Sequence, residues 1–189
     1  EDTKKYLKNQ DKIFVTGNPV RSSLSLIEKN DACKYFSISS DKKTLLVLGG
    51  SLGAFSINEA VAESINKINE NDLQLIWMTG KLYYEKYKSF EGKNIKVIPF
   101  IENMQEAYSS ADLVIARAGA TTIAEITSLG KVSILIPSPN VAANHQYYNA
   151  KSLADIGAAL LLKDSEAKEK LFELVHKIIF DKEALTDIS

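Results

Sequence analysis

Short apolar runs alternate with longer amphipathic stretches along most of the chain. The runs carry almost no polar residues, which is typical of parallel strands covered by helices on both faces. They predict strands at residues 13–16, 44–48, 73–78, 95–98, 113–116 and 133–136, and a weaker one at 158–161. The intervening periodicity predicts helices at about 54–68, 81–88, 103–109, 120–128, 145–155 and 165–180. This alternation indicates repeated βα units.

Right-handed βα units build an open α/β fold, a doubly wound parallel sheet of the Rossmann-like kind. Such sheets bind ligands beyond the carboxyl ends of their strands, so candidate chemistry is sought in the loops that follow each strand. Two stretches have the composition of linkers, the polar start and residues 28–41. The sequence shows no domain boundary within the chain. We therefore expect one domain over residues 1–189.

Composition narrows the possible partners. With 45% hydrophobic residues, 25% charged residues and a net charge of -1, the chain has no basic excess for nucleic acid or an anionic membrane surface. The one cysteine, Cys33, has no partner for an internal disulfide, which favours a reducing compartment and a buried, apolar role for its side chain. The chain begins at Glu1 without methionine and stops soon after a helical pattern, so we expect a fragment of a longer protein.

The first candidate loop reads GGSLGA at residues 49–54 and leads directly into a helix. Glycines allow close backbone approach to a ligand, and the free N–H groups of a helix start favour phosphate. A tight turn with glycines kept for packing is the alternative interpretation. The spacing does not match the dinucleotide pattern G-x-G-x-x-G, and the Gly80-Lys81 pair lacks the rest of a P-loop.

Two further loops carry polar groups that suit a nucleotide sugar. In AGATTIAE, at residues 118–125, Glu125 lies about one turn into a helix, where it could accept hydrogen bonds from a ribose diol or simply stabilise the helix start. The adjacent Arg117 could equally be a solvated surface charge. In PSPNVAANHQYYN, at residues 137–149, amides and a histidine gather at another helix start, with Asn144 as the expected N-cap.

An arginine follows the first apolar run, in the turn GNPVR at residues 17–21. Arg21 could reach a phosphate or a base carbonyl, although an arginine after a turn is more often exposed and idle. We expect no metal site, because the two histidines, His145 and His176, lie far apart and no D-x-D pair is present.

Five blocks together resemble the C-terminal half of the MurG family of GT-B glycosyltransferases. They are TGNPVR at 16–21, LGGSLGA at 48–54, PFI at 99–101, ADLVIARAGATTIAEI at 111–126 and NHQYYNA at 144–150. The family moves GlcNAc from UDP-GlcNAc onto the lipid-linked muramyl-pentapeptide precursor of peptidoglycan. The blocks occur in the family's order, which makes this resemblance far more specific than any one glycine-rich loop.

The resemblance implies a role for each loop. Arg21 would contact the nucleotide, Ser51 and its neighbouring amides the diphosphate, the backbone of Ile101 the uracil, Glu125 the ribose, and Gln146 the GlcNAc hydroxyls. The implied UDP-GlcNAc-binding set is Arg21, Ser51, Leu52, Gly53, Ile101, Ala120, Thr121, Thr122, Ile123, Ala124, Glu125, His145, Gln146 and Asn149. Some family members carry glutamine where this chain has His145, so the resemblance does not fix how the sugar is held there.

The resemblance also implies what this chain lacks. In the family the N-terminal half supplies the surface for the acceptor lipid and the base that activates the acceptor hydroxyl. The chain would then be the donor-binding domain of an inverting enzyme, without catalytic residue, metal or cofactor of its own, and inactive alone. The parent would act in the cytoplasm, peripherally on the cell membrane. A related UDP-sugar enzyme, such as a 2-epimerase or a glycolipid glycosyltransferase, and a non-catalytic nucleotide-binding module remain alternatives.

Overall fold

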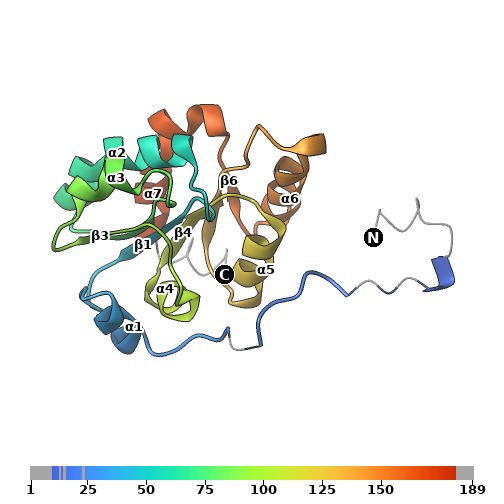
Figure 1. Ribbon diagram of the computed structural model, residues 1–189, viewed down its shortest axis with the longest axis horizontal. Coiled ribbons are helices and arrows are strands. Elements are labelled where there is room, and N and C mark those ends of the chain that lie inside the picture. Colours follow the sequence, from blue (N-terminus) through green and yellow to red (C-terminus); the bar gives the residue numbers. More distant parts are fainter. Residues whose placement is uncertain (1–9, 13, 15, 23, 182–189) are drawn as a thin grey trace.

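The computed structural model describes residues 10–12, 14, 16–22 and 24–181 (Figure 1). Its centre is a six-stranded sheet in the order β3-β2-β1-β4-β5-β6, and every neighbouring pair is parallel. The strands are β1 (Thr44–Leu48), β2 (Gln74–Met78), β3 (Ile95–Ile98), β4 (Leu113–Ala116), β5 (Ser133–Leu135) and β6 (Leu160–Leu161). The doubly wound parallel sheet expected from the sequence is confirmed.

Of the expected first strand, at residues 13–16, the structure describes Phe14 and Thr16, and neither lies in this sheet. Phe14 and Thr16 are not in a strand, and the Phe14 side chain is 84% exposed. Ile13 and Val15 lie outside the described residues. An apolar run therefore marks a strand only where a neighbouring strand and a covering helix are present to bury it.

The main helices are α1 (Lys29–Tyr35), α2 (Phe55–Glu70), α3 (Tyr84–Tyr87), α4 (Met104–Ser110), α5 (Ala120–Ser128), α6 (His145–Ala154) and α7 (Ala167–Ile179). Short 3-10 turns lie at Gln10–Lys12, Lys88–Phe90, Ala142–Asn144 and Asp164–Glu166. Helix α1 corrects the expectation of a linker at 28–41. Its Ala32 and Cys33 are buried and the helix packs against α4, a tertiary contact that its polar sequence does not announce.

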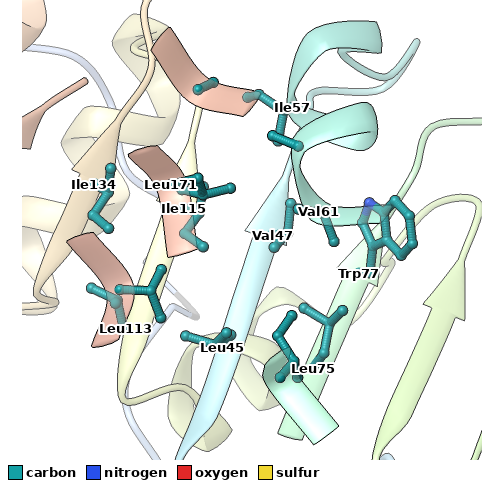
Figure 2. Packing of buried hydrophobic residues seen from close by; sticks show 14 of the residues in the cluster. Leu45, Val47, Ile57, Val61, Leu75, Trp77, Leu113, Ile115, Ile134 and Leu171 are labelled. Carbon is teal, nitrogen blue, oxygen red and sulfur yellow. The ribbon is translucent and has the colours of Figure 1, made fainter. Parts of the chain in front are cut away.

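Alternating strand residues point into two separate cores, one on each face of the sheet. Leu45 and Val47 of β1 pack with α2 and α7, as Figure 2 shows for Ile57, Val61 and Leu171. Leu46 and Leu48, on the other face, pack with α4, α5 and α6. In Figure 1, α2 and α7 accordingly lie above the sheet, and α1, α4 and α5 below it. Among the described residues, no helix has the length and apolarity needed to cross a membrane.

The strand order places the ligand-binding edge. β1 lies between β2 and β4, so the chain winds outward in one direction through β2 and β3 and in the other through β4, β5 and β6. The loops after β1 and β4 diverge at this reversal, and a crevice forms there in doubly wound sheets. The GGSLGA loop follows β1, and the AGATTIAE loop follows β4.

Candidate functional site

A cleft of about 540 Å³ opens at this reversal of the strand order. Loops that follow β1, β2, β4, β5 and β6 contribute to its wall. The lining residues are Gly49, Gly50, Gly53, Ala54, Phe55, Ser56, Tyr83, Arg117, Gly119, Thr122, Ser138, Pro139, Asn140, Gln146 and Asp164. The fold thus brings the glycine loop, the loop after β4 and the proline-containing loop together, as the sequence predicts.

Two helices begin at this cleft without a side-chain cap. The N-cap of α2 is Ala54 and that of α5 is Gly119, and neither has a side chain that can accept from the first N–H groups. The first turn of any helix leaves N–H groups without an intrahelical partner, and the helix dipole adds positive potential there. Both residues line the cleft. The cleft is therefore suited to an anion with several oxygens, such as a diphosphate.

The glycine loop has a compact turn at its centre. The Gly53 N–H donates to the Gly50 carbonyl at 3.0 Å, and both glycines have positive φ. Gly53 lines the cleft, as expected. Ser51 and Leu52, also predicted to bind, lie at the exposed tip of the turn and do not line it, and Leu52 is 73% exposed.

Arg117 is built into the cleft wall, so the interpretation as a solvated surface charge is wrong. Its side chain is only 15% exposed and forms an ion pair with Asp164, which precedes α7. Nη2 donates to Ser56 Oγ at 2.9 Å, and Ser56 Oγ donates to Asp164 Oδ1 at 2.6 Å. Nη1 also donates to the carbonyls of Ile136 and Pro137.

This arrangement leaves donors on Arg117 available. Among the described residues, its Nε and one Nη2 hydrogen have no hydrogen-bond partner. A guanidinium with free N–H groups beside two uncapped helix starts can donate to phosphate oxygens. The sequence does not identify Arg117, Ser56 and Asp164 as site residues, because only the fold brings together the loop after β4, the start of α2 and the turn before α7.

Of His145, Gln146 and Asn149, the three residues of segment 137–149 in the predicted UDP-GlcNAc-binding set, one lines the cleft. Gln146 lines it, and its Oε1 accepts from the Ser138 N–H at 2.9 Å, which fixes the side-chain amide. Asn149 Nδ2 instead donates to the Ala118 carbonyl at 3.2 Å and so braces the loop after β4. His145 is exposed, and its Nδ1 lies 2.8 Å from the Ala142 carbonyl.

Asn144 precedes α6, but it is not the side-chain cap that the sequence predicts. It adopts φ 52 and ψ 27, in the left-handed region, and its side chain makes no capping hydrogen bond. Ala143 before it also has positive φ. Two consecutive left-handed residues turn the chain sharply, which brings the first turn of α6 and Gln146 to the cleft.

A second pocket of about 220 Å³ adjoins the first. Gly50 and Thr122 line both, so the two form one continuous site. The other lining residues of the second pocket are Arg21, Leu48, Met78, Phe100, Ile101, Glu102, Met104, Tyr108, Thr121 and Glu125. Apolar walls with a few polar groups are typical of a site that holds a flat ring.

Glu125 is the buried polar group of this second pocket, at 6% exposed. Tyr108 donates its hydroxyl to Oε2 at 2.9 Å, and Arg21 Nη2 donates to Oε1 at 3.2 Å. Burial, and then the neighbouring Glu125 carboxylate, raise the pKa of Tyr108 far above its usual value, so the phenol remains a donor. Arg21 therefore forms an ion pair and is not an unpaired surface charge.

The remaining predicted residues divide between the pocket and its support. The backbone N–H of Ile101 donates to the Met78 sulfur at 3.4 Å, and the residue lines the pocket. Thr121 and Thr122 also line it, whereas Ala120, Ile123 and Ala124 of α5 do not. Within the described part of the chain, no group of three or more His, Cys, Asp or Glu side chains could hold a metal ion.

The fold and the site define a doubly wound α/β domain with a cleft that suits a nucleoside diphosphate. Residues 44–188 match the glycosyltransferase family 28 C-terminal domain. The match covers most of the chain, and the chain therefore belongs to this family.

Individual relatives of known name are more informative than the family as a whole. The chain is 42% identical over 183 residues to the UDP-N-acetylglucosamine--N-acetylmuramyl-(pentapeptide) pyrophosphoryl-undecaprenol N-acetylglucosamine transferase of Flavobacterium psychrophilum, covering 95% of this chain and 50% of that protein. It is 41% identical over 195 residues to the transferase of the same name from Bacillus subtilis, covering 100% of this chain and 53% of the relative. The chain thus spans about half the length of the relatives it matches.

Solved structures agree with the fold. MurG of Acinetobacter baumannii matches with a TM-score of 0.68 and 29% identity, over 93% of this chain and 54% of the other. The calicheamicin glycosyltransferase CalG4 has the same TM-score at 13% identity, over 98% of this chain and 44% of the other, which shows a shared fold only. The expected resemblance to the MurG family and to GT-B glycosyltransferases is confirmed.

Proposed function

We propose that this chain is the UDP-GlcNAc-binding half of an inverting glycosyltransferase. The parent enzyme moves GlcNAc onto the lipid-linked muramyl-pentapeptide, at the cytoplasmic face of the cell membrane. The observation that carries the proposal is the convergence of two uncapped helix starts and Arg117 on one cleft, continuous with an apolar pocket around Glu125. The names of the relatives support the choice of donor and acceptor.

The two pockets divide the donor between them. The smaller, apolar pocket suits uridine, with the Ile101 backbone at the base and the Glu125 carboxylate at the ribose hydroxyls. The larger cleft takes the diphosphate between the starts of α2 and α5, and Gln146 holds the sugar. Gly50 and Thr122, which line both pockets, would then lie at the junction of nucleoside and diphosphate.

In the proposed reaction, the acceptor hydroxyl oxygen attacks C1 of GlcNAc from the face opposite the diphosphate. The bond between C1 and the diphosphate oxygen breaks, UDP leaves with the electron pair, and the hydroxyl proton passes to a base in the half of the protein that this chain lacks. The task of this half is to stabilise negative charge developing on the diphosphate. Fixed N–H donors do so well, since losing one costs about 2.7–4 kcal/mol of barrier in other enzymes.

Calorimetric titration of the chain tests the proposal. UDP and UDP-GlcNAc are expected to bind, UDP-glucose more weakly and NADH not at all. Failure of both uridine nucleotides to bind would overturn it. A preference for UDP-glucose over UDP-GlcNAc would instead favour a related UDP-sugar enzyme of the same architecture. Transfer of labelled GlcNAc is expected only with the full-length parent, and turnover by this chain alone would contradict its role as half of the site.

A further inference from the structure

Two glycines from different loops touch backbone to backbone beneath the cleft. A Cβ on Gly53, in the loop after β1, would lie 2.2 Å from the carbonyl oxygen of Thr79. A Cβ on Gly80, in the loop after β2, would lie 2.2 Å from the Gly53 nitrogen. Both glycines also have positive φ, +86° and +82°. Any side chain at either position would push the two loops apart.

A buried amide holds this contact together. Asn58, in the second turn of α2, is completely buried, and its Nδ2 donates to the Thr79 carbonyl at 2.9 Å. Its Oδ1 accepts from the Trp77 indole N–H at 2.8 Å, and Trp77 is itself fully buried in β2. Thr79 O is thus fixed between Asn58 on one side and Gly53 on the other.

The glycine loop needs support of this kind. Residues 49–54 include three glycines, whose backbone freedom makes a fixed conformation entropically costly. Inside the loop, the main-chain bond from Gly53 to Gly50 spans only one turn. Amides stabilise developing charge well only when they are already oriented. The wall against which this loop rests is the turn at Thr79 and Gly80.

We propose that Asn58 is a positioning residue for diphosphate binding. It holds the Thr79-Gly80 turn against Gly53 and thereby fixes the amides at the start of α2. The proposal rests on the proposed function, because it assigns the diphosphate to this loop. Asn58 does not line either pocket and would act only through the turn.

A matched pair of glycine variants tests this role. Gly80→Ala introduces both a positive-φ alanine and the clash with Gly53, whereas Gly157→Ala introduces only the strain, because φ is +75° and no atom lies within 4 Å of the added Cβ. Both variants are expected to lose stability through the positive-φ alanine, and Gly80→Ala more, because the clash with Gly53 adds to the strain. Only Gly80→Ala should lose UDP affinity, by about tenfold, which corresponds to 1.4 kcal/mol. Uridine affinity, followed by NMR titration, should stay within about twofold of wild type, well inside that tenfold step.

A second pair of variants separates the effect of Asn58 on UDP binding from its effect on the stability of the core. Trp77→Phe removes one hydrogen bond to Asn58 but leaves the bond to Thr79, so it should lower the melting temperature and preserve UDP affinity. Asn58→Ala removes both hydrogen bonds of Asn58 and should lower the affinity for UDP but not the affinity for uridine. If Asn58→Ala does not fold, Gly80→Ala still tests whether the contact between the turn and Gly53 supports UDP binding.

Different results would contradict the positioning role of Asn58 and the proposed function of the chain. Unchanged UDP affinity in folded Asn58→Ala or folded Gly80→Ala, equal losses of UDP affinity in Gly80→Ala and Gly157→Ala, or parallel losses of UDP and uridine affinity would overturn the positioning role. If wild type binds neither UDP nor uridine, the proposed function fails instead, and the inference falls with it.

Discussion

Arg21 Nη2 lies 3.2 Å from Glu125 Oε1, although the two residues are 104 positions apart in the chain. The sequence assigns both to the nucleotide, but separately. In the structure each is the other's counter-ion at the edge of the second pocket, and Tyr108 donates to the second carboxylate oxygen. A nucleotide bound as proposed would have to fit around this ion pair, and substitution of either residue removes the counter-ion of the other.

Replacing Glu125 should separate binding from stability. Glu125→Gln keeps an acceptor for the Tyr108 hydroxyl but loses the charge, so UDP affinity should fall about tenfold, in line with the 1.5–3 kcal/mol of a hydrogen bond to a charged group. Glu125→Ala should lose the same affinity and also about 1–3 kcal/mol of unfolding free energy, because the buried Tyr108 hydroxyl loses its acceptor. Calorimetry and urea unfolding measure the two effects. Unchanged UDP affinity in Glu125→Gln would show that Glu125 has a structural role only.

Replacing Arg117 and replacing Asp164 should have different effects on UDP affinity. Removing either partner leaves a largely buried charge, so each single alanine variant should lose about 3 kcal/mol of stability, and the double variant less than the sum. Arg117→Ala should weaken UDP binding at least tenfold. Asp164→Ala frees the guanidinium of its counter-ion and should leave UDP affinity equal or higher.

The double-mutant cycle also provides the control for Arg117. Equal losses of UDP affinity in Arg117→Ala and Asp164→Ala would mean that the pair only supports the cleft wall. Arg117→Lys keeps the charge but not the paired donors, and an intermediate affinity is expected from it.

The free energy of unfolding should fall at alkaline pH, because buried tyrosines lose their protons there. Burial, followed by the hydrogen bond to Glu59, raises the pKa of Tyr87 from 10.0 to about 12. A raised pKa in the folded state means that folding favours the protonated phenol, so its contribution is complete below pH 10 and is lost as the pH approaches 12. Tyr108 shifts in the same direction. Urea unfolding between pH 8 and about 12 measures the decline.

Tyr87→Phe provides the comparison for the alkaline effect. The variant should be less stable than wild type at neutral pH, because Glu59 loses a hydrogen bond, yet it should show a shallower decline above pH 10. A wild-type stability that stays level or rises through this range would contradict the assignment.

Chelation should leave donor binding unchanged. The described residues hold no cluster of metal-ligating side chains, and helix starts with Arg117 provide the positive potential that a divalent cation would otherwise supply. UDP titrations in EDTA and in magnesium are expected to give the same affinity. A large loss of affinity in EDTA would show that a metal carries part of the diphosphate charge.

The sequence by itself determined the class of fold and the location of the site. Continuous apolar runs can only be buried between two helical layers, so the strands from β1 to β6 and the doubly wound arrangement follow from local pattern. The glycine-rich and polar loops after β1, β4 and β5 were identifiable because turns and helix starts leave a local signature in residue type.

Only the tertiary structure decided which side chains meet. Arg117 follows β4, Ser56 lies in the first turn of α2 and Asp164 begins the 3-10 turn before α7, while Gly53 and Gly80 lie in two different loops. No local pattern encodes a contact across such separations. The described residues of the run at 13–16 and the polar segment at 28–41 depart from the prediction for the same reason. The described part of the first has no strand to pair with, while α1 in the second gains stability from its packing on α4. Burial by distant neighbours, not local propensity, settles such segments.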